Sequence, residues 1–235
     1  MALLPNLSAG ERDSEAAVPQ LAITPLDHSK LEFAVRLHAV ALPHGFFVRL
    51  GRRYLRAYYT TFVDGPDAVA LLATLDGLPA GILVGTTANA RHYAWVVRHR
   101  SLRLALCGVL GLLARPPVAL AFVRSRLLRY LRGLVRLCRA SKPSARAATA
   151  TMASDVAVLT HVAVAEVVQG HGVGAALVRA FEQAAVHAGG RRAVLVTLAG
   201  PHGAAGMYEQ LGWNSTGQRH DHDGRAISEY TRELH

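Results

Sequence analysis

The N-terminal part of the chain alternates between strand-like and helix-like spacing of its apolar residues. Residues 21–25 predict a short strand, and Asp27 is a candidate N-cap for the helix that follows. That helix is indicated by four residues at helical spacing, Leu31, Val35, His38 and Leu42. A second helix is predicted after Pro43, with one face made of Phe47, Leu50, Tyr54 and Tyr58. Residues 68–76 and 80–87 predict two strands joined at Asp76-Gly77, a typical hairpin turn.

The C-terminal half alternates between strands and helices. Apolar, β-branched residues from Val156 to Ala165 predict a strand, and helical spacing predicts a helix from Gly172 to Ala188. Residues 193–198 are apolar without interruption, which is typical of a strand covered on both faces. A short helix over 203–211 and a hairpin turning at Asp223-Gly224 complete the pattern. The alternation predicts an α/β fold with parallel pairing at its centre.

A glycine-rich turn separates the strand of 156–165 from the helix that follows it. Its sequence is Gln169-Gly170-His171-Gly172-Val173-Gly174. Glycines let a ligand approach the backbone, and the free N–H groups of a helix N-terminus favour a phosphate. The spacing differs from the Gly-x-Gly-x-x-Gly of dinucleotide folds, and the Gly-Lys-Ser/Thr of a P-loop is missing. These two nucleotide-binding classes are therefore excluded.

Two segments of this half resemble the GNAT family of acetyltransferases. Gln169-x-x-Gly172-x-Gly174, which follows Val162-Ala163-Val164-Ala165, is similar to that family's Arg/Gln-x-x-Gly-x-Gly/Ala signature. Ala204 with the segment Met207–Trp213 resembles its Ala-x-x-Leu-Tyr-Glu-Lys-x-Gly-Phe helix. The two segments occur in the family's order, separated by one helix and one strand. The resemblance implies an α/β GNAT fold over residues 21–235, with a mixed central sheet flanked by helices.

The resemblance also implies which residues hold an acyl-coenzyme A co-substrate. The loop would bind the pyrophosphate through backbone N–H groups, and the preceding strand would hydrogen-bond the pantetheine arm. The implied cofactor-binding residues are Val162, Ala163, Val164, Gln169, Gly170, His171, Gly172, Val173, Gly174, Ala175 and Ala204. Tyr208 matches the tyrosine that protonates the departing thiolate in many members. Pro201 stands where the family often has an Asn that contacts the cofactor, so that contact is not carried over.

An amine acceptor calls for a proton acceptor, because an alkylamine of pKa about 10.4 is almost fully protonated at pH 7. His161 on the cofactor strand is the first candidate, and Asp155 at the start of that strand is the second. The catalytic candidates are thus Tyr208, His161 and Asp155. His44 is a further candidate base, since the loop between the first two helices borders the acceptor site in this family. His44 and Phe46 are accordingly expected to bind the acceptor.

Charge divides the chain into two unequal parts. Residues 91–146 contain twelve Arg and one Lys without any Asp or Glu, so the net charge of +10 divides into +13 here and −3 elsewhere. One face of a predicted amphipathic helix is apolar, with Leu127, Leu131, Leu134 and Cys138, and another is basic, with Arg129, Arg132, Arg136 and Arg139. A helix over 101–113 is expected to pair with it before Pro116-Pro117. We therefore expect a basic helical hairpin inserted at about 90–150, between the third and fourth strands.

The sequence leaves the partner of this insert open. An anionic membrane surface, an acidic acyl carrier protein and an acidic peptide all suit an arginine-rich face. The insert is also a candidate for lining the acceptor site or for holding a homodimer together. Nucleic acid is disfavoured, because no binding motif or interleaved aromatic residues accompany the charge.

Several other features exclude further classes of protein. Cys107 and Cys138 are too few for a disulfide framework and lack metal-ligand spacing. His220-Asp221-His222-Asp223 adjoins a glycine turn without a third ligand, so a solvated hairpin tip is favoured over a metal site. Residues 1–20 lack the basic start and apolar run of an export signal and predict a flexible leader. The apolar stretch 104–114 is too short to span a membrane. We expect a cytoplasmic protein, peripheral to a membrane if the insert contacts lipid.

The leading functional hypothesis is an N-acyltransferase. It would move an acetyl or longer acyl group from acyl-coenzyme A to a small-molecule or peptide amine by direct attack in a ternary complex. One alternative is acyl transfer from an acyl carrier protein to a peptide or natural product, and another is a non-catalytic GNAT-like binding module. Neither cysteine lies near the motifs, so a thiol intermediate is not supported.

Overall fold

A computed structural model describes residues 19–43, 45–122, 156–200, 204–221 and 224–235 of the chain. Its strands are β1 (Leu21–Pro25), β2 (Ala68–Leu75), β3 (Leu78–Thr86), β4 (Val156–Val164), β5 (Arg192–Leu198), β6 (Asn214–His220) and β7 (Ala226–Glu233). They form one seven-stranded sheet in the order β1-β2-β3-β4-β5-β7-β6. Among the strands of the described residues, only the β4–β5 pair is parallel, which confirms the expected parallel pairing at the centre.

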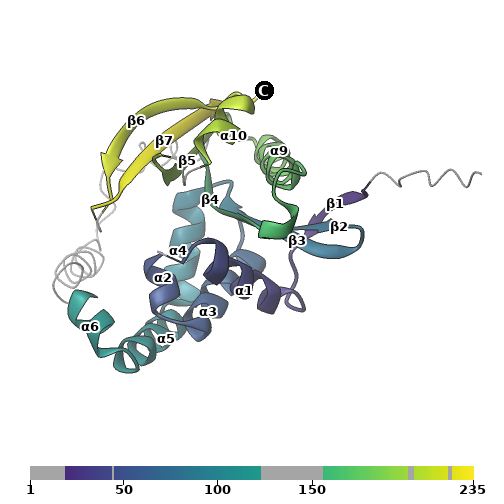
Figure 1. Cartoon of the computed structure of the whole chain (residues 1–235). Coiled ribbons are helices and arrows are strands. Elements are labelled where there is room, and N and C mark those ends of the chain that lie inside the picture. The colour runs from purple at the N-terminus through teal and green to yellow at the C-terminus, as the bar shows by residue number, and fades with distance from the viewer. Residues whose placement is uncertain (1–18, 44, 123–155, 201–203, 222–223) are drawn as a thin grey trace, which may run out of the picture.

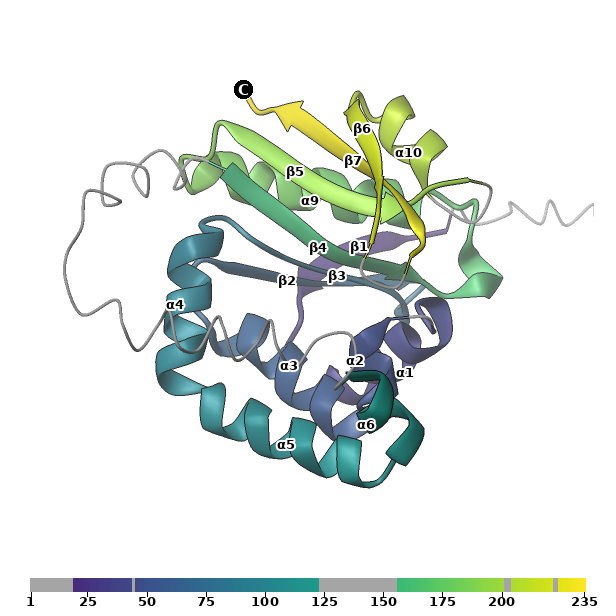
Figure 2. The ribbon, with the colours of Figure 1, turned by 90° about the vertical axis from the view of Figure 1, so that its left-hand side faces the viewer.

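Helices cover both faces of the sheet, as Figures 1 and 2 show. One face carries α9 (Val173–His187) and α10 (Ala205–Gln210). The other face carries α1 (Leu31–Ala41), α2 (Phe46–Arg49) and α3 (Arg52–Asp64). This mixed sheet flanked by helices confirms the predicted fold class. A short 3₁₀ turn, η3 (Glu166–Val168), leads from β4 toward α9.

Two hydrophobic clusters form the core, one on each face of the sheet. The cluster beneath α9 includes Leu83, Leu177 and Phe181, all fully buried. The cluster beneath α1 and α3 includes Val35 and Tyr59, also fully buried. Side chains of β3 and β4 point alternately to the two faces and pack into both clusters, as expected for central strands covered by helices.

The N-terminal helices differ from the prediction at two points. The first helix begins at Leu31, because Asp27 accepts hydrogen bonds at Oδ1 from the backbone N–H groups of Ser29 (2.7 Å) and Lys30 (3.2 Å) and forms a turn instead. The predicted second helix is divided into α2 and α3. Gly51, with a φ of 92°, lies between them in a conformation that an α-helix cannot contain.

The predicted hairpin at Asp76-Gly77 is confirmed. Both residues have positive φ, 51° and 77°, as a tight turn of this sequence requires. The hairpin joins β2 and β3 in antiparallel pairing.

In the region where an insertion was predicted, the described residues after β3 form three helices. They are α4 (Asn89–His99), α5 (Ser101–Leu113) and α6 (Pro116–Phe122). The bounds of α5 confirm the predicted helix over 101–113, whereas α4 was not predicted. The predicted amphipathic helix of Leu127 to Arg139 lies outside the described residues. No helix among the described residues is both long enough and apolar enough to cross a membrane.

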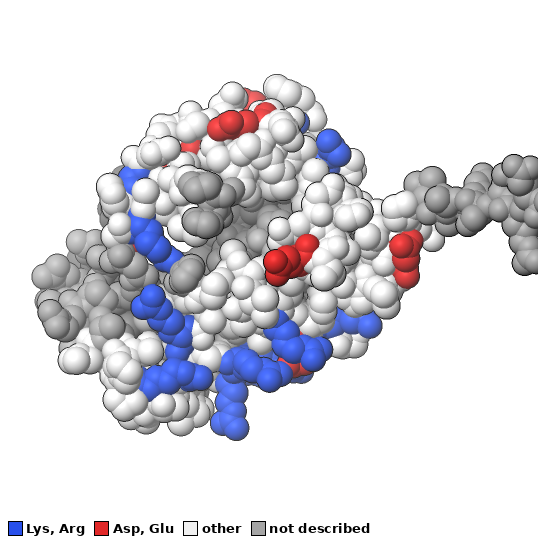
Figure 3. Space-filling model, viewed as in Figure 1, with Lys and Arg blue, Asp and Glu red and all other residues white. Residues whose placement is uncertain are grey.

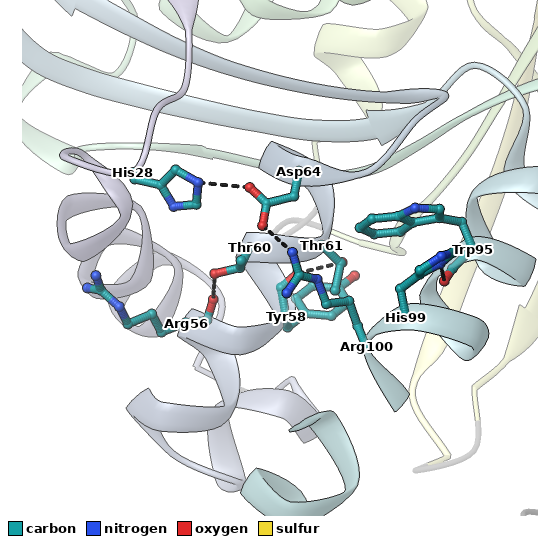
Figure 4. Close-up of polar contacts among 9 residues, drawn as sticks. All are labelled: His28, Arg56, Tyr58, Thr60, Thr61, Asp64, Trp95, His99 and Arg100. Carbon is teal, nitrogen blue, oxygen red and sulfur yellow. Dashed lines mark hydrogen bonds and ion pairs between the residues drawn. The ribbon is translucent and has the colours of Figure 1, made fainter. Parts of the chain in front are cut away.

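An ion pair connects the beginning of this inserted region to the end of α3. Asp64 contacts His28 Nε2 through one carboxylate oxygen (2.8 Å) and Arg100 Nη2 through the other (2.7 Å), as Figure 4 shows. The Arg100 guanidinium also lies 5.7 Å from the centre of the Trp95 ring. Arg100 sits between α4 and α5, so this ion pair fixes both helices relative to α3.

The C-terminal half follows the predicted order of strand, helix, strand, helix and hairpin. One expectation was wrong. Strand β5 is not covered on both faces, because Ala193 and Leu195 are buried whereas Val196 on the other face is 48% exposed. The apolar residues on that face line cavities instead of a second packed layer.

Candidate functional site

The sheet divides at the middle of β4. Strand β4 pairs with β5 only from Val156 to Leu159, and beyond that point the two strands separate. On its other edge, β4 has a β-bulge at Thr160, because Val84 lies opposite His161 while Gly85 lies opposite Leu159. The bulge reverses the alternation of side chains. Leu159 therefore faces the α9 cluster, whereas His161 faces α1 and α3.

A cavity of about 790 Å³ occupies this division. Its floor is the separated part of β4 and β5, and its walls come from the end of α1, the glycine-rich loop, α10 and the β6–β7 turn. The size is in the range typical of sites for small molecules and cofactors. The cavity thus joins the segments that the sequence singled out, although they lie far apart in the chain.

Most of the predicted cofactor-binding residues line this cavity. They are Val162, Val164, Gln169, Gly170, Gly172, Val173, Gly174, Ala175 and Ala204. Two others do not. Ala163 points to the opposite face and is buried in the core beneath α1 and α3, and the exposed His171 does not border the cavity.

Glycines shape the loop that forms one wall. Gly170 and Gly172 have φ values of 82° and 78°, which β-carbon-bearing residues rarely adopt. A β-carbon on Gly174 would lie 3.0 Å from Met207 Sδ in α10, so this glycine allows α9 and α10 to approach closely. The first intrahelical bond of α9 is donated by Ala176 to Gly172, which leaves the preceding N–H groups of the helix N-terminus without intrahelical acceptors.

Tyr208 from α10 reaches the cavity from the side of the glycine-rich loop. Its ring packs against Trp213 (5.9 Å between centroids) and Tyr230 (6.0 Å), which fix its direction. Its hydroxyl makes no hydrogen bond within the described part of the chain. Burial raises the pKa of Tyr208 to about 12, so the hydroxyl keeps its proton at neutral pH.

His161 belongs to a cluster of two histidines and two tyrosines at the other end of the cavity. Its Nε2 lies 3.2 Å from the Tyr58 hydroxyl, and its ring lies 4.8 Å from the ring of His38. His38 Nδ1 in turn lies 2.8 Å from the Tyr59 hydroxyl. Burial lowers the pKa of His38 to about 4, and burial together with the nearby His38 lowers the pKa of His161 to about 3. Both imidazoles are therefore neutral at pH 7.

The sequence did not single out His38, Tyr58 and Tyr59 as candidate site residues. His38 and Tyr58 lay on the apolar faces of predicted helices, where a packing role is expected, and His38 is indeed buried. Only the pairing of β4 with β3 brings His161 to a helix more than a hundred residues earlier in the chain. Arg225 and Asp221 were likewise missed as lining residues. Arg225 Nη2 pairs with an Asp221 carboxylate oxygen (2.8 Å) at the cavity wall.

Three residues that the sequence singled out, Asp155, His44 and Pro201, lie outside the described residues. Phe46 does not line the cavity, although its neighbours Pro43 and Gly45 do. Among the described residues, no group of three or more His, Cys, Asp or Glu is arranged to hold a metal ion.

A second cavity of about 550 Å³ lies on the sheet face opposite α9. It shares Leu159, Thr160 and Val196 with the first cavity, so the two adjoin at the point where the sheet divides. Its own lining combines apolar and hydroxyl side chains, including Val158, Val194, Thr216 and Thr231. The division is thus accessible from both faces of the sheet.

These features define a mixed α/β protein with a ligand cavity where its central sheet divides. Residues 121–213 match the model of the acetyltransferase (GNAT) family. The matched segment contains both motifs on which the resemblance to this family rests, and it covers 93 of the 235 residues. No curated protein matches the chain in sequence.

Solved structures with the same fold are distant in sequence. The ribosomal-protein-S18-alanine N-acetyltransferase from Escherichia coli is 14% identical, with 92% of this chain and 94% of that chain covered and a TM-score of 0.50. A GNAT acetyltransferase from Streptococcus pneumoniae is 14% identical over 92% and 100%, with a TM-score of 0.52. An aminoglycoside 6′-N-acetyltransferase complexed with coenzyme A is 10% identical over 90% and 96%, with a TM-score of 0.53. At these identities the likeness shows the fold alone.

Proposed function

We propose that this protein is an N-acyltransferase that uses acyl-coenzyme A as donor and an amine as acceptor. The observation that carries the proposal is the single cavity at the divided sheet, because it unites the glycine-rich loop, the unpaired edge of β4 and Tyr208. The family match supports the same class of reaction. A second candidate, transfer from an acyl carrier protein, shares this chemistry and differs in how the donor is presented.

The residues present fit coenzyme A. Gly172, Val173 and Gly174 at the start of α9 line the cavity, and their backbone N–H groups would receive the pyrophosphate, because neither glycine has a side chain to block it. Within the described residues, the edge of β4 from Thr160 to Val164 has no partner strand on the β5 side, so its backbone groups are available to the amide groups of a pantetheine arm. The donor supplies a thioester, which is the activated acyl group.

The reaction requires no covalent enzyme intermediate. The amine nitrogen forms a bond to the thioester carbonyl carbon, the C–S bond breaks, and the sulfur leaves as a thiolate that takes up a proton. The Tyr208 hydroxyl is the proposed donor toward that sulfur, and its pKa of about 12 makes it a hydrogen-bond donor throughout the physiological range. The proton of the amine passes to His161 or to water.

The environment of His161 restricts how it can take part. Proton transfer from a free alkylammonium of pKa about 10.4 to a group of pKa about 3 is uphill by on the order of 10 kcal/mol. We therefore propose that the acceptor binds as the neutral amine and donates a hydrogen bond to His161. The nitrogen becomes acidic only as the new C–N bond forms, and its proton leaves at that stage. The role of His161 as a base stays a prediction.

The proposal is tested by calorimetric titration with coenzyme A, acetyl-coenzyme A and a long-chain acyl-coenzyme A. We expect binding of at least one of them, and at least tenfold weaker binding by Gly174→Val, since a side chain there meets Met207 and Val164. Gly206→Val is the matched control, because Gly206 in α10 has no atom within 4 Å of its β-carbon position. Unchanged binding by the Gly174 variant would contradict the assigned loop. No binding of any ligand would leave a carrier-bound donor or a non-catalytic module.

A further inference from the structure

Helix α5 is apolar on two opposite faces. Its inner face packs on the α2–α3 region, where Gly108 faces the ring of Tyr54 and Gly111 lies against the backbone of Leu50. Its outer face is an apolar stripe at helical spacing, and the side chains of the stripe are between 52% and 82% exposed. They are Leu102, Leu106, Val109 and Leu113. At 3.6 residues per turn the two faces point about 170° apart. A helix that is apolar all round is expected to be covered on both sides.

The helices before and after α5 each carry an exposed apolar side chain as well. Tyr93 in α4 is 61% exposed and Leu120 in α6 is 62% exposed. We call the set Tyr93, Leu102, Leu106, Val109, Leu113 and Leu120 the α4–α6 apolar surface. Scattered exposed apolar residues are ordinary, whereas a run of them along one helix indicates a binding surface.

The charge around the α4–α6 apolar surface has one sign. Residues 89–122 contain five Arg and no Asp or Glu. Exposed Arg98 and Arg103 on these helices, and exposed Arg53 on the adjoining α3, form no ion pair within the described part of the chain. Figure 3 shows Lys and Arg gathered along the lower part of the molecule, over α1 to α3 and α5, with few acidic side chains among them.

We propose that the α4–α6 apolar surface docks on an anionic lipid membrane. A lipid surface has an apolar acyl region and anionic head groups. The exposed leucines would enter the acyl boundary, and the arginines beside them would contact the head groups. A second copy of the chain matches less well, because a symmetric contact would bring these arginines against one another. The ion pair of Arg100 with Asp64 holds α4 and α5 rigidly on α3, so the surface is presented without rearrangement.

The α4–α6 apolar surface is close to the candidate site along the chain. Leu50, against which α5 packs, lies five residues after Gly45, which lines the cavity. The proposal nevertheless stands apart from the enzymatic one, because it makes no use of the cavity residues.

The test is co-sedimentation of the full chain with phosphatidylcholine vesicles that contain or lack about 30% phosphatidylglycerol as the anionic lipid. We expect binding only to the anionic vesicles, weakened in high salt. Leu106→Glu should reduce the affinity at least tenfold, whereas Leu78→Glu, at a residue 71% exposed in the β2–β3 hairpin, should leave it unchanged. Arg103→Glu should reduce it about fivefold or more, with Arg179→Glu on α9 as the matched control.

Each other outcome overturns the proposal. Vesicle binding that Leu106→Glu leaves unchanged would place the contact elsewhere in the chain, and would leave the outer face of α5 to the predicted amphipathic helix of Leu127 to Cys138. Absence of vesicle binding with a dimer that Leu106→Glu dissociates would make the surface an interface between two copies. Absence of vesicle binding with salt-sensitive binding to polyglutamate would indicate an acidic protein partner. Circular dichroism of each variant verifies that the fold is retained, since all the altered side chains are exposed.

Discussion

At the scale of single residues, two titratable groups at opposite ends of the cavity are neutral for the same reason. Burial raises the pKa of Tyr208 and lowers that of His161, so the tyrosine keeps its proton and the histidine lacks one. In the proposed reaction, the tyrosine would then be the proton donor to the thioester sulfur and the histidine the hydrogen-bond acceptor of the amine. This arrangement is what a transfer reaction between two neutral reactants requires.

Replacement of Tyr208 by Phe removes a hydroxyl that forms no hydrogen bond within the described residues. We expect kcat to fall by about 100-fold, with the Kd for coenzyme A unchanged, because the lost group acts on the leaving sulfur and not on the bound donor. Steady-state kinetics together with calorimetry measure the two quantities. An unaffected kcat would limit Tyr208 to anchoring α10 against Trp213 and Tyr230.

Burial of His38 makes the stability of the protein sensitive to acid. The folded-state pKa of about 4 lies below the unfolded value of 6.5, so the unfolded chain binds the proton more tightly. Stability is full above pH 6.5 and falls as the pH drops from 6.5 toward 4, by about 3 kcal/mol for this residue. His38→Gln keeps a polar partner for Tyr59 and should flatten this part of the profile in urea denaturation. His187→Gln, at an exposed position, should leave the profile as it is.

At the scale of elements, the bulge in β4 determines which side chains of this strand face each helical layer. It directs Leu159 to one helical layer and His161 to the other, and it coincides with the end of the β4–β5 ladder. Gly85, opposite Leu159, has no room for a side chain, since a β-carbon there would lie 2.6 Å from the Phe181 ring and 2.7 Å from the Val158 carbonyl oxygen. The glycine lets α9 lie flat on the sheet next to the bulge.

Gly85→Ala is therefore expected to destabilise the protein by about 1–3 kcal/mol through overpacking. Because Phe181 is fully buried and the carbonyl belongs to the sheet, neither neighbour can yield freely. Chemical denaturation gives the free energy of unfolding, and Gly206→Ala in α10 provides the comparison. A loss no larger than that of the Gly206 variant would show that α9 can shift away from the sheet.

The elements that the sequence predicted well are those with a local cause. The helix after Gly172 follows from apolar spacing and a glycine start, and the hairpin at Asp76 follows from its turn residues. The bulge at Thr160 has no such signal within its own strand, because β4 contains no glycine or proline. The pairing of His161 with Tyr58 depends on the sheet register, and the exposed face of β5 depends on how far two strands separate. Neither the register of the sheet nor the separation of two strands can be predicted from the spacing of apolar residues within one segment.

At the scale of the whole molecule, acid and base are unevenly placed relative to the cavity. The helical layer that contains α3 and α5 carries unpaired arginines, whereas the ion pair of Asp221 with Arg225 is at the cavity wall. The cavity lining among the described residues is mostly apolar or neutral. The positive charge is therefore concentrated on the surface of the helical layer that contains α3 and α5. The proposed reaction would take place in a cavity whose lining is mostly uncharged.

The early end of the β4–β5 ladder also has a mechanical consequence. Only four pairs of residues, Val156 to Leu159 with Arg192 to Leu195, connect the two parts of the sheet directly, and α9 bridges them on one side. A ligand lying along the rest of β4 would act as a missing strand and lock the two parts together. The protein would then be loose when empty and stiff when loaded, so that its rigidity reports whether the site is filled.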